Sequence, residues 1–325
     1  MSTAVISRRG VDRVRAGHPW IYRADVISCD GRPGDLVRVR NERDRMLGWA
    51  FWSDASQISL RMLAGTASGA EEPIDERQIF GERLRRAIEY RASLAIDGTA
   101  CRLVHGEADR LPALVVDRYA DWLVIQTLSQ GMDRRIGLIV ELLVEIVGPR
   151  GILARNDPRV RRLEGLDETI DVVFGDVPAV VDVSEGRIRH LVDVRHGQKT
   201  GLFLDQQENH AAAARYASGR ALDAFSYLGG FALQMAPHCD AVLAIDSSAP
   251  AVTAIREAAV RNGVTNVEAR EGNVFDELRE LEIAGERFRT IVLDPPAFAR
   301  NRAAVDRAVA GYKEINLRAL KLLEP

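Results

Sequence analysis

The sequence predicts an α/β protein in three parts: a small β-rich unit, a middle α/β module and an incomplete doubly wound parallel sheet. Two observations carry this prediction. Apolar and polar residues alternate over short runs near the N-terminus, as in half-buried strands, and from about residue 190 apolar strands alternate with helical stretches. The second order predicts parallel strands with right-handed crossovers. We place the three parts at residues 1–66, 67–189 and 190–325.

In the first part, alternation predicts strands at residues 36–40, 47–52 and 58–63, which would form a small barrel or sandwich. The small, polar stretch at 65–73 has no periodicity and is typical of a linker. Asp75 then predicts the N-cap of a helix over about 76–95, with Phe80, Leu84 and Ile88 on its buried face.

The middle part is predicted to contain strands at 102–104, 113–118, 122–126 and 152–154 and a helix near 132–147. In the third part, predicted strands at 221–225, 241–246, 266–270 and 290–294 alternate with helices at 230–238, 248–262 and 302–323. Parallel strands end at one edge of a sheet, so polar residues that follow them share one crevice.

The composition is that of an ordinary globular protein, with 46% hydrophobic and 28% charged residues among 325. We find no apolar run long enough for a membrane span and no signal-peptide pattern, so we expect a cytoplasmic protein without a membrane partner. Three scattered cysteines, Cys29, Cys101 and Cys239, predict neither a disulfide framework nor a metal site. Residues 1–66 carry eleven arginines against seven acidic residues, which fits RNA binding, although genome composition alone also enriches arginine.

Polar motifs follow all four strands of the third part. After the first strand, Asp223 precedes a turn with Gly229, where backbone can approach a carboxylate or phosphate. The glycines lack the GxGxxG spacing of a dinucleotide site. Asp246 ends the second strand and can accept both hydroxyls of a ribose. After the third strand, Asn273 and Phe275 offer a polar contact and an apolar wall to an adenine.

The fourth strand ends at Asp294, which is followed by Pro295, Pro296 and, two residues later, Phe298. Two prolines stiffen the exit from the strand. Asp294 can accept hydrogen bonds from a flat base, and Phe298 can stack on it. We interpret this stretch as the wall that holds a flipped-out base beside a methyl donor.

The order of these motifs resembles the S-adenosylmethionine site of class I methyltransferases. Five further stretches extend the resemblance: GHPWIY (17–22), PGDLVRVR (33–40), RLVHGEADRLP (102–112), GQKTGLFLDQQENH (197–210) and YKEIN (312–316). With DAFSYLGGF and DPPAFARN, the chain resembles nearly end to end the bacterial 23S rRNA cytosine-C5 methyltransferases that carry an N-terminal PUA domain. The resemblance implies a PUA-like RNA-binding domain, a Rossmann-like methyltransferase domain, S-adenosylmethionine as cofactor and large-subunit ribosomal RNA as partner. It leaves the oligomeric state open, with a homodimer as one option.

The resemblance also implies roles for single residues. The cofactor-binding set is Asp205, Gln206, Asp223, Phe225, Ser226, Gly229, Asp246, Asn273, Phe275 and Asp294, and the substrate-binding set is Lys199, Pro295, Pro296 and Phe298. Thr200 and Phe203 would lie near the donor or the base. Asp294 is the catalytic candidate and would orient the base. A plain alternative for 197–210 is a hairpin that leads into a helix.

Cytosine C5 becomes nucleophilic enough to be methylated when a thiolate adds to C6. In some RNA cytosine methyltransferases this cysteine stands where the chain has Pro296. In the family that the chain resembles, it lies instead in a Ser-Cys-Ser stretch after the helix that ends in LKLLEP. We therefore expect a fragment of a longer protein, with 290–294 as an exposed edge strand and the helix 302–323 with little to pack against. A naturally shortened relative is the rival expectation.

Three other functions stay open. Transfer to an exocyclic or ring nitrogen of an RNA base also uses an Asp-Pro-Pro-aromatic motif and needs no thiol. A non-catalytic RNA-binding protein would bind RNA in a salt-sensitive manner without transferring a methyl group. A nicotinamide enzyme is disfavoured by the glycine spacing.

Overall fold

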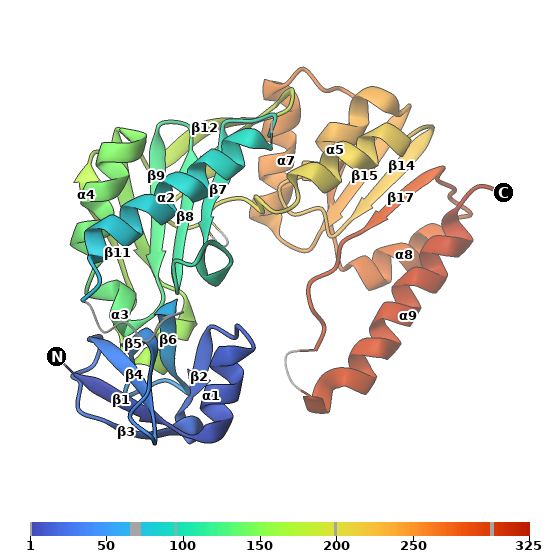
Figure 1. Ribbon diagram of the computed structural model, residues 1–325. Helices are drawn as coiled ribbons and strands as arrows, with labels where there is room; N and C mark the ends of the chain where they lie inside the picture. Colours follow the sequence, from blue (N-terminus) through green and yellow to red (C-terminus); the bar gives the residue numbers. More distant parts are fainter. Residues whose placement is uncertain (1, 66–72, 95, 198–199, 300–301) are drawn as a thin grey trace. The chain divides into compact units, whose positions relative to one another are not determined.

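The computed structural model of the chain describes residues 2–65, 73–94, 96–197, 200–299 and 302–325 (Figure 1). Two compact units result from the contacts within it. The first comprises the chain up to Val181 together with Val192–Leu202, and the second comprises Asp182–Leu191 and Phe203–Pro325. Most of the predicted linker at 65–73 lies outside the described residues.

The first unit begins with a six-stranded sheet in the order β2-β6-β5-β4-β1-β3. Its elements are β1 (Thr3–Ile6), α1 (Arg8–Arg15), β2 (Trp20–Tyr22), β3 (Val26–Cys29), β4 (Leu36–Asn41), β5 (Met46–Trp52) and β6 (Ile58–Gly65). The three strands expected from alternation are confirmed as β4, β5 and β6. The sequence did not predict β1, β2 and β3, whose three or four residues are too few to show an alternation of apolar and polar side chains.

The first unit also contains a five-stranded sheet in the order β11-β10-β9-β8-β7. Its strands are β7 (Ala100–His105), β8 (Leu114–Tyr119), β9 (Trp122–Thr127), β10 (Gly151–Asn156) and β11 (Thr169–Gly175). Of these, β11 was not predicted. The parallel pair β9–β10 is bridged by α3 (Gln130–Asp133) and α4 (Ile136–Val147), so the single helix expected at 132–147 is divided.

Helix α2 (Glu76–Ser93) packs beside α4 against this sheet (Figure 1). Asp75 caps it as predicted, since its carboxylate accepts a hydrogen bond from the Gln78 backbone N–H at 3.1 Å. Phe80 and Leu84 are fully buried and Ile88 is half-buried, which confirms the predicted face.

A two-stranded hairpin, β12 (Val180–Glu185) and β13 (Ile188–Asp193), is divided between the units: Asp182–Leu191 belongs to the second, and the chain returns to the first at Val192. The second unit holds four parallel strands in the order β16-β15-β14-β17. They are β14 (Arg220–Ala224), β15 (Ala241–Asp246), β16 (Val267–Glu271) and β17 (Thr290–Leu293), and all four were predicted. Strand β14 lies between β15, the next strand in the sequence, and β17, the last of the described strands. The strand order therefore changes direction at β14. Ligand crevices of doubly wound sheets lie at such a point.

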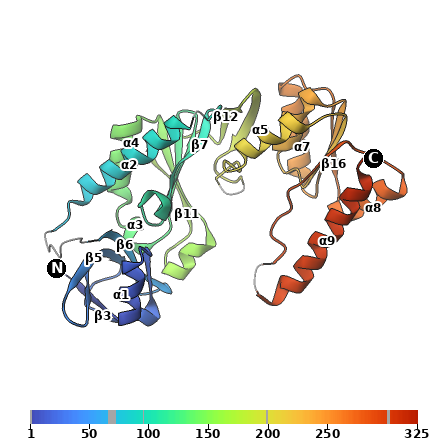
Figure 2. The same ribbon diagram turned by 45° about the vertical axis from the view of Figure 1, so that its right-hand side comes forward.

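Helices cover both faces of this parallel sheet (Figure 2). They are α5 (Gln207–Tyr216), α6 (Gly230–Met235), α7 (Ala249–Arg261), α8 (Val274–Ile283) and α9 (Val305–Leu322). On β14, Ala221 belongs to a core with α6 and α7, while the next residue, Leu222, belongs to a core with α8 and α9. Period-two alternation thus divides the apolar residues between two layers.

The expectation that the helix over 302–323 has little to pack against is wrong. Helix α9 packs on α8 and β17 and buries Ile315 and Leu322 in the core that contains Phe288. Its end is also tied down by backbone hydrogen bonds of 2.9 Å from Phe288 N to Leu322 O and from Glu324 N to Phe288 O. Within the described sheet, β17 is an edge strand.

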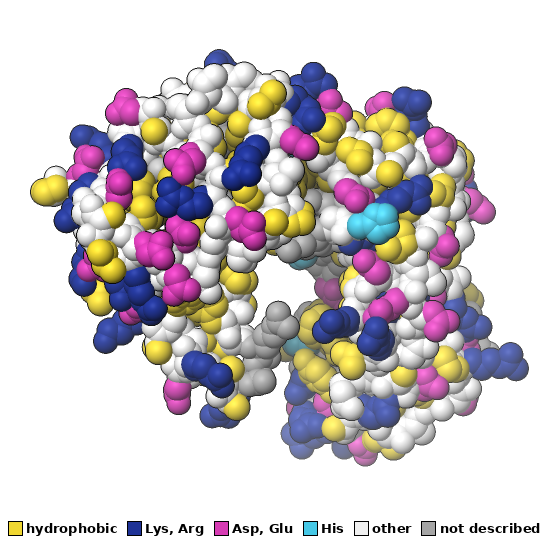
Figure 3. Space-filling view, turned by 180° about the vertical axis from the view of Figure 1, so that it is seen from behind, with side chains coloured by type: hydrophobic (Ala, Val, Ile, Leu, Met, Phe, Trp, Pro, Cys, Tyr) yellow, Lys and Arg dark blue, Asp and Glu magenta, His cyan; other side chains and the backbone are white. Residues whose placement is uncertain are grey.

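None of the helices that the described residues form is both long and apolar enough to cross a bilayer. On the face shown in Figure 3, Lys and Arg side chains are interspersed with Asp and Glu. Mixed charge of this kind is typical of an ordinary hydrated surface.

Candidate active site

The turn after β14 has an unusual backbone. Phe225 (φ +67°) and Tyr227 (φ +49°) take the left-handed conformation that side chains rarely adopt, and Gly229 (φ +77°) does the same without steric cost. Each strained residue costs about 1–3 kcal/mol, so neighbouring contacts must hold it. Here Ser226 N donates to Ile245 O at 3.0 Å, and Tyr227 N donates to the Asp246 carboxylate at 2.9 Å. Strain of this kind is concentrated at ligand sites.

Asp223 and Ser226 supply two buried oxygens on this turn. Asp223 is fully buried, and its Oδ2 accepts a hydrogen bond of 2.9 Å from the Ala232 N–H. Its Oδ1 and the Ser226 Oγ are buried without a hydrogen-bond partner among the described residues. Buried polar atoms are rarely left unpaired, so a water molecule or a polar group of a ligand is the partner to expect for each. The polar groups of S-adenosylmethionine fit this requirement.

Three acids predicted at strand ends are brought together. Burial raises the pKa of Asp223 to about 7, an effect that the nearby negative charges of Asp294 and Asp246 reinforce and that the Ala232 N–H opposes. Asp246 ends β15 with both oxygens engaged, one by Tyr227 N and the other by Ser248 N at 2.9 Å. Each carboxylate oxygen has a second lone pair, so Asp246 retains the capacity to accept ribose hydroxyls.

Asn273 and Phe275 lie where α8 begins. The sequence did not predict this helix. Asn273 is its N-cap, and its side-chain oxygen accepts a hydrogen bond from the Phe275 N–H at 2.9 Å. The asparagine thus has a structural role, and its exposed amide NH₂ is the group that could contact an adenine.

An aromatic cluster forms the wall next to Asp294. The Phe298 ring centroid lies 4.5 Å from that of Tyr312, 5.6 Å from that of Phe275 and 6.3 Å from that of Phe225. The Phe298 N–H also donates to the Tyr312 hydroxyl at 3.3 Å. Phe298 is therefore fixed by its neighbours as part of a wall, with only some of its surface open for stacking.

The residues of the Asp-Pro-Pro turn itself are more open. Asp294 and Pro296 are exposed and Pro295 is half-buried. The backbone N–H of Asp294 points to Ala224 O at 3.5 Å, which keeps the turn beside the end of β14. An exposed carboxylate on a stiff turn is suited to contact a ligand in the crevice.

The stretch at 197–210 divides between the two units. In the second unit, the Phe203 ring meets the Tyr227 ring edge-on at 5.0 Å, which places Phe203 beside the strained turn. Asp205 is exposed, and Gln206, just before α5, accepts a hydrogen bond of 2.6 Å from the Asn209 amide. The substrate role predicted for Lys199 cannot be placed, since that residue lies outside the described residues.

Thr200 belongs to the first unit and is buried there. Its hydroxyl donates to Asp117 at 2.6 Å and lies 2.9 Å from the Tyr119 hydroxyl. The Tyr119 oxygen also accepts from the Leu202 N–H at 3.2 Å. Thr200 thus anchors this segment to β8, and its hydroxyl is already engaged.

Sequence reasoning missed a buried pair behind the turn. Glu185 Oε1 and His210 Nδ1 lie 2.6 Å apart, and the His210 ring meets Phe231 edge-on at 4.4 Å. A Cβ on Gly230 would come within 2.3 Å of the His210 ring, so this position requires glycine. The paired glycines and the histidine that closes the 197–210 stretch were the signals available, whereas nothing in the sequence marked Glu185.

Comparison with known proteins fits this geometry. A family model of PUA-like domains matches residues 5–64. Among solved structures, a Streptococcus mutans protein described as a SAM-dependent methyltransferase aligns over 100% of this chain and 83% of its own, with a TM-score of 0.79 and 17% identity. SMU.776, described as a methyltransferase and complexed with SAH, gives a TM-score of 0.83 at 18% identity, and the alignment covers 100% of this chain and 84% of SMU.776. At these identities the structures show a shared fold.

The curated relatives are more similar in sequence. The protein named ribosomal RNA large subunit methyltransferase I from Aeromonas hydrophila is 38% identical over 318 residues, which cover 95% of this chain and 79% of the relative. The protein of the same name from Erwinia tasmaniensis is 36% identical over 317 residues, with the same two coverages. Identity at this level, spread over both units, is that of one family. The chain belongs to the ribosomal RNA large subunit methyltransferase I family.

Proposed function

We propose that this protein methylates C5 of a cytosine in 23S ribosomal RNA. Family membership makes it a methyltransferase that uses S-adenosylmethionine and acts on large-subunit ribosomal RNA. The finer statement, that the acceptor is carbon 5 of cytosine, is the proposal. An rRNA substrate also sets the expected site of action in the cytoplasm. The observation that supports the methyl-donor site is the convergence of Asp223, Asp246 and Asp294 at the switch point of the parallel sheet, and the acceptor atom is inferred from the motifs GQKTGLFLDQ and DAFSYLGGF.

S-Adenosylmethionine supplies an electrophilic methyl group when bound. In this proposal Asp223 and Ser226 use their unpaired buried oxygens to hold its polar atoms, and Asp246 accepts its ribose hydroxyls. Phe225 and Phe275, whose rings both neighbour that of Phe298, contribute apolar surface for the adenine. Asp205 and Gln206 complete the crevice from the segment before α5.

The base would be held by the turn after β17. Asp294 is exposed and accepts hydrogen bonds from the amine of a cytosine, which orients the ring, while Pro295 and Pro296 keep the turn rigid. Rigid placement of a reacting base lowers the barrier by sparing the entropy of orientation.

Attack at carbon requires a thiolate that adds to C6 of the cytosine. The C5 carbon then takes the methyl group, a base removes the C5 proton, and the S–C6 bond breaks to release the thiolate. Within the second unit, Cys239 precedes β15 and lies at the opposite end of that strand from Asp246, so it is not placed for this step. Burial also raises the pKa of Cys239, which disfavours a thiolate.

One alternative is transfer to a nitrogen of the base, which the Asp294-Pro295-Pro296 turn fits equally well. An amine lone pair attacks a methyl group directly and needs no thiol. Asp294, Pro295 and Pro296 would then hold the amine in line with the donor.

Product analysis separates the two. The full-length protein, as its source cell makes it, is incubated with unmodified large-subunit RNA and S-adenosylmethionine labelled in its methyl group, and the RNA is digested to nucleosides. We expect the label in 5-methylcytidine. Label in an N-methylated nucleoside would replace the C5 proposal by the alternative. An RNA-binding protein without catalysis would leave the RNA unlabelled.

A further inference from the structure

The stretch RLVHGEADRLP at 102–112 has no part in the site above. It forms the end of β7 and a 3₁₀ turn at Gly106–Asp109. Its carboxylates serve the fold: Glu107 accepts hydrogen bonds from Trp20 Nε1 at 2.8 Å and from Arg61 at 3.0 Å. Asp109 likewise accepts two from Arg91, at 2.5 and 2.7 Å.

Arg110 differs from these residues. It ends the turn in the left-handed conformation (φ +57°), and its exposed guanidinium makes no hydrogen bond or ion pair with any described residue. Its carbonyl accepts a hydrogen bond of 2.5 Å from Arg83 of α2. Arg83 donates a second one, at 2.7 Å, to Leu63 O of β6. Arg83 therefore pins the turn to the helix and holds two cationic side chains close together.

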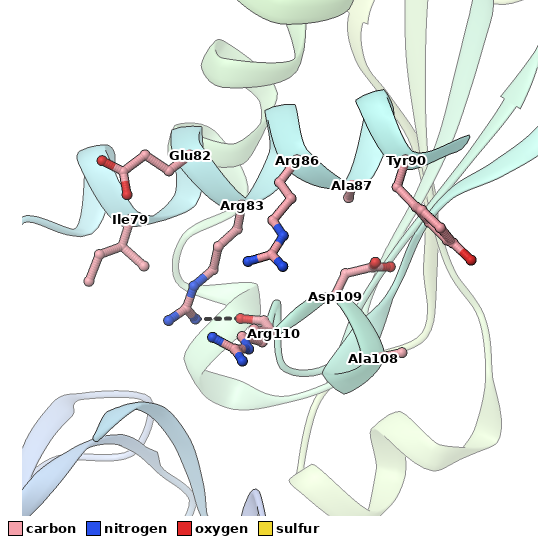
Figure 4. A pocket seen from close by; sticks show the side chains of 9 residues that line it. All are labelled: Ile79, Glu82, Arg83, Arg86, Ala87, Tyr90, Ala108, Asp109 and Arg110. Carbon is pink, nitrogen blue, oxygen red and sulfur yellow. Dashed lines mark hydrogen bonds between the residues drawn. The ribbon is translucent and has the colours of Figure 1, made fainter. Parts of the chain in front are cut away.

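The crowding of positive charge is visible in the pKa of Arg83, which is lowered by burial and further by the charge of Arg110. Arg86 adds a third cation one turn along α2, and it too has no partner among the described residues. Figure 4 shows Arg83 and Arg86 reaching from the helix, and Arg110 from the turn, into one space. Cations that face one another and outnumber the neighbouring carboxylates favour a bound anion.

The space between them is a groove of about 600 Å³ in the first unit, open to solvent. Two carboxylates, Asp109 and Glu82, also line the groove. Arg91 neutralises Asp109 through two hydrogen bonds, so the remaining lining charges are one carboxylate, Glu82, and three guanidinium groups. A second hollow of about 460 Å³ shares Arg83 and Arg110 with the first and continues past His18. The groove thus runs from the middle of the unit onto its N-terminal sheet.

We propose that this groove binds the phosphodiester backbone of the substrate RNA, with Arg86 and Arg110 each contacting a phosphate. The proposal rests on the function proposed above and names a surface of the first unit that holds the substrate, whereas the residues of the methyl-transfer site belong to the second unit. Planar guanidinium groups bind phosphate oxygens through two parallel hydrogen bonds. Tyr90, another lining residue, is 56% exposed; the Arg91 guanidinium lies over its ring, 5.2 Å from the centroid, so an unpaired base would stack on the other face of the ring.

The test is the salt dependence of RNA binding by the full-length protein. The double variant Arg86→Gln/Arg110→Gln is compared with the wild type on unmodified large-subunit RNA over a series of KCl concentrations, without S-adenosylmethionine. The logarithm of the RNA association constant decreases linearly with the logarithm of the KCl concentration, and each phosphate contact adds about 0.7–0.9 to the steepness of that line. Loss of two contacts should therefore make the line less steep by about 1.5. Methyl transfer at saturating RNA should keep its kcat, while the KM for RNA rises.

Two controls separate a phosphate site from general loss of charge. Arg85→Gln removes one positive charge from α2, as Arg86→Gln does, but Arg85 lines a different hollow with Asp75 and Leu142, so its slope should stay near that of the wild type. The pair Arg86→Lys/Arg110→Lys keeps both charges and should retain the slope. Equal slopes for the double glutamine variant and Arg85→Gln would overturn the proposal.

Methyl transfer by the wild type is measured on the same RNA. Transfer by the wild type, together with an unchanged slope in the double glutamine variant, would reject the groove and leave the proposed function standing. RNA that the wild type neither binds nor methylates would reject both.

Discussion

Asp223 is a carboxyl group that the fold keeps away from water. Burial raises its pKa to about 7, from an ordinary value of 3.8. Between about pH 4 and pH 7 the folded protein therefore holds a proton that the unfolded chain has released, so this residue lowers the stability progressively as the pH rises. The cost is absent below pH 4 and complete above about pH 7.

Asp223→Asn should remove this dependence. We expect the variant to gain stability relative to the wild type as the pH is raised from about 4 to about 7, because asparagine loses no proton. Melting temperatures measured by calorimetry across this range test it. Asp97→Asn is the control, since Asp97 is exposed. A difference between Asp223→Asn and the wild type that stays constant with pH would contradict the raised pKa.

Gly230 is required by a contact that the sequence conceals. In Gly230→Ala the new Cβ would come within 2.3 Å of the His210 ring, which is held by Glu185, and we expect a loss of about 1–3 kcal/mol in the free energy of unfolding. Urea denaturation measures this loss. Gly137→Ala in α4 is the matched control, because a Cβ there meets no atom within 4 Å and the helix accepts alanine well. Similar stabilities for the two variants would show that His210 moves aside freely.

At the scale of elements, α9 is the helix whose packing the sequence did not predict. It has one face in the core and one in water: Ile315 is 1% exposed, whereas Leu320, on the same helix, is 68% exposed. The helix is thus an integral layer of the second unit.

Two truncations on α9 test this placement. Ile315→Ala should lower the free energy of unfolding by about 2–4 kcal/mol, because it removes buried methyl groups and leaves a cavity. Leu320→Ala should change it by less than about 0.5 kcal/mol, as is usual for an exposed position. Chemical denaturation followed by circular dichroism measures both. Equal effects would mean that α9 is not docked on α8 and β17.

At the scale of the whole molecule, the structure divides the chain into two compact units, while the sequence predicted three domains at 1–66, 67–189 and 190–325. The three-domain division stays a prediction. Within the first unit, one core contains Phe51 and Leu63 of the six-stranded sheet together with Phe80 of α2 and strands β7 to β10. The Phe51 and Phe80 rings stack at 6.3 Å.

A shared core predicts shared stability. Phe51→Ala should cost about 3–5 kcal/mol and should lower the hydrogen-exchange protection of β4–β6 and of β7–β10 by similar amounts. Exchange measured by mass spectrometry resolves the two sheets. Leu47→Ala, on the same strand but only partly buried against the core of the six-stranded sheet, is the control and should affect mainly β4–β6. Loss of protection confined to β4–β6 in Phe51→Ala would favour separate domains.

The sequence by itself determined the features that depend on neighbouring residues. The alternation of residues 36–63, the Asp75 cap, the four parallel strands and the acids that end them all follow from periodicity and local hydrogen bonding, which act over a few positions. The family followed from motifs that are contiguous in the chain, such as DAFSYLGGF and GQKTGLFLDQ.

Only the tertiary structure decided what depends on residues far apart in the chain. It set the strand order β16-β15-β14-β17, the packing of α9, the pairing of Glu185 with His210 and the meeting of Arg86 with Arg110 in one groove. A short strand or a single side chain shows no sequence periodicity. Its partner is the surface against which it is buried when the whole chain excludes water from its apolar side chains. That choice is made by the whole chain as it packs, so no local pattern contains it.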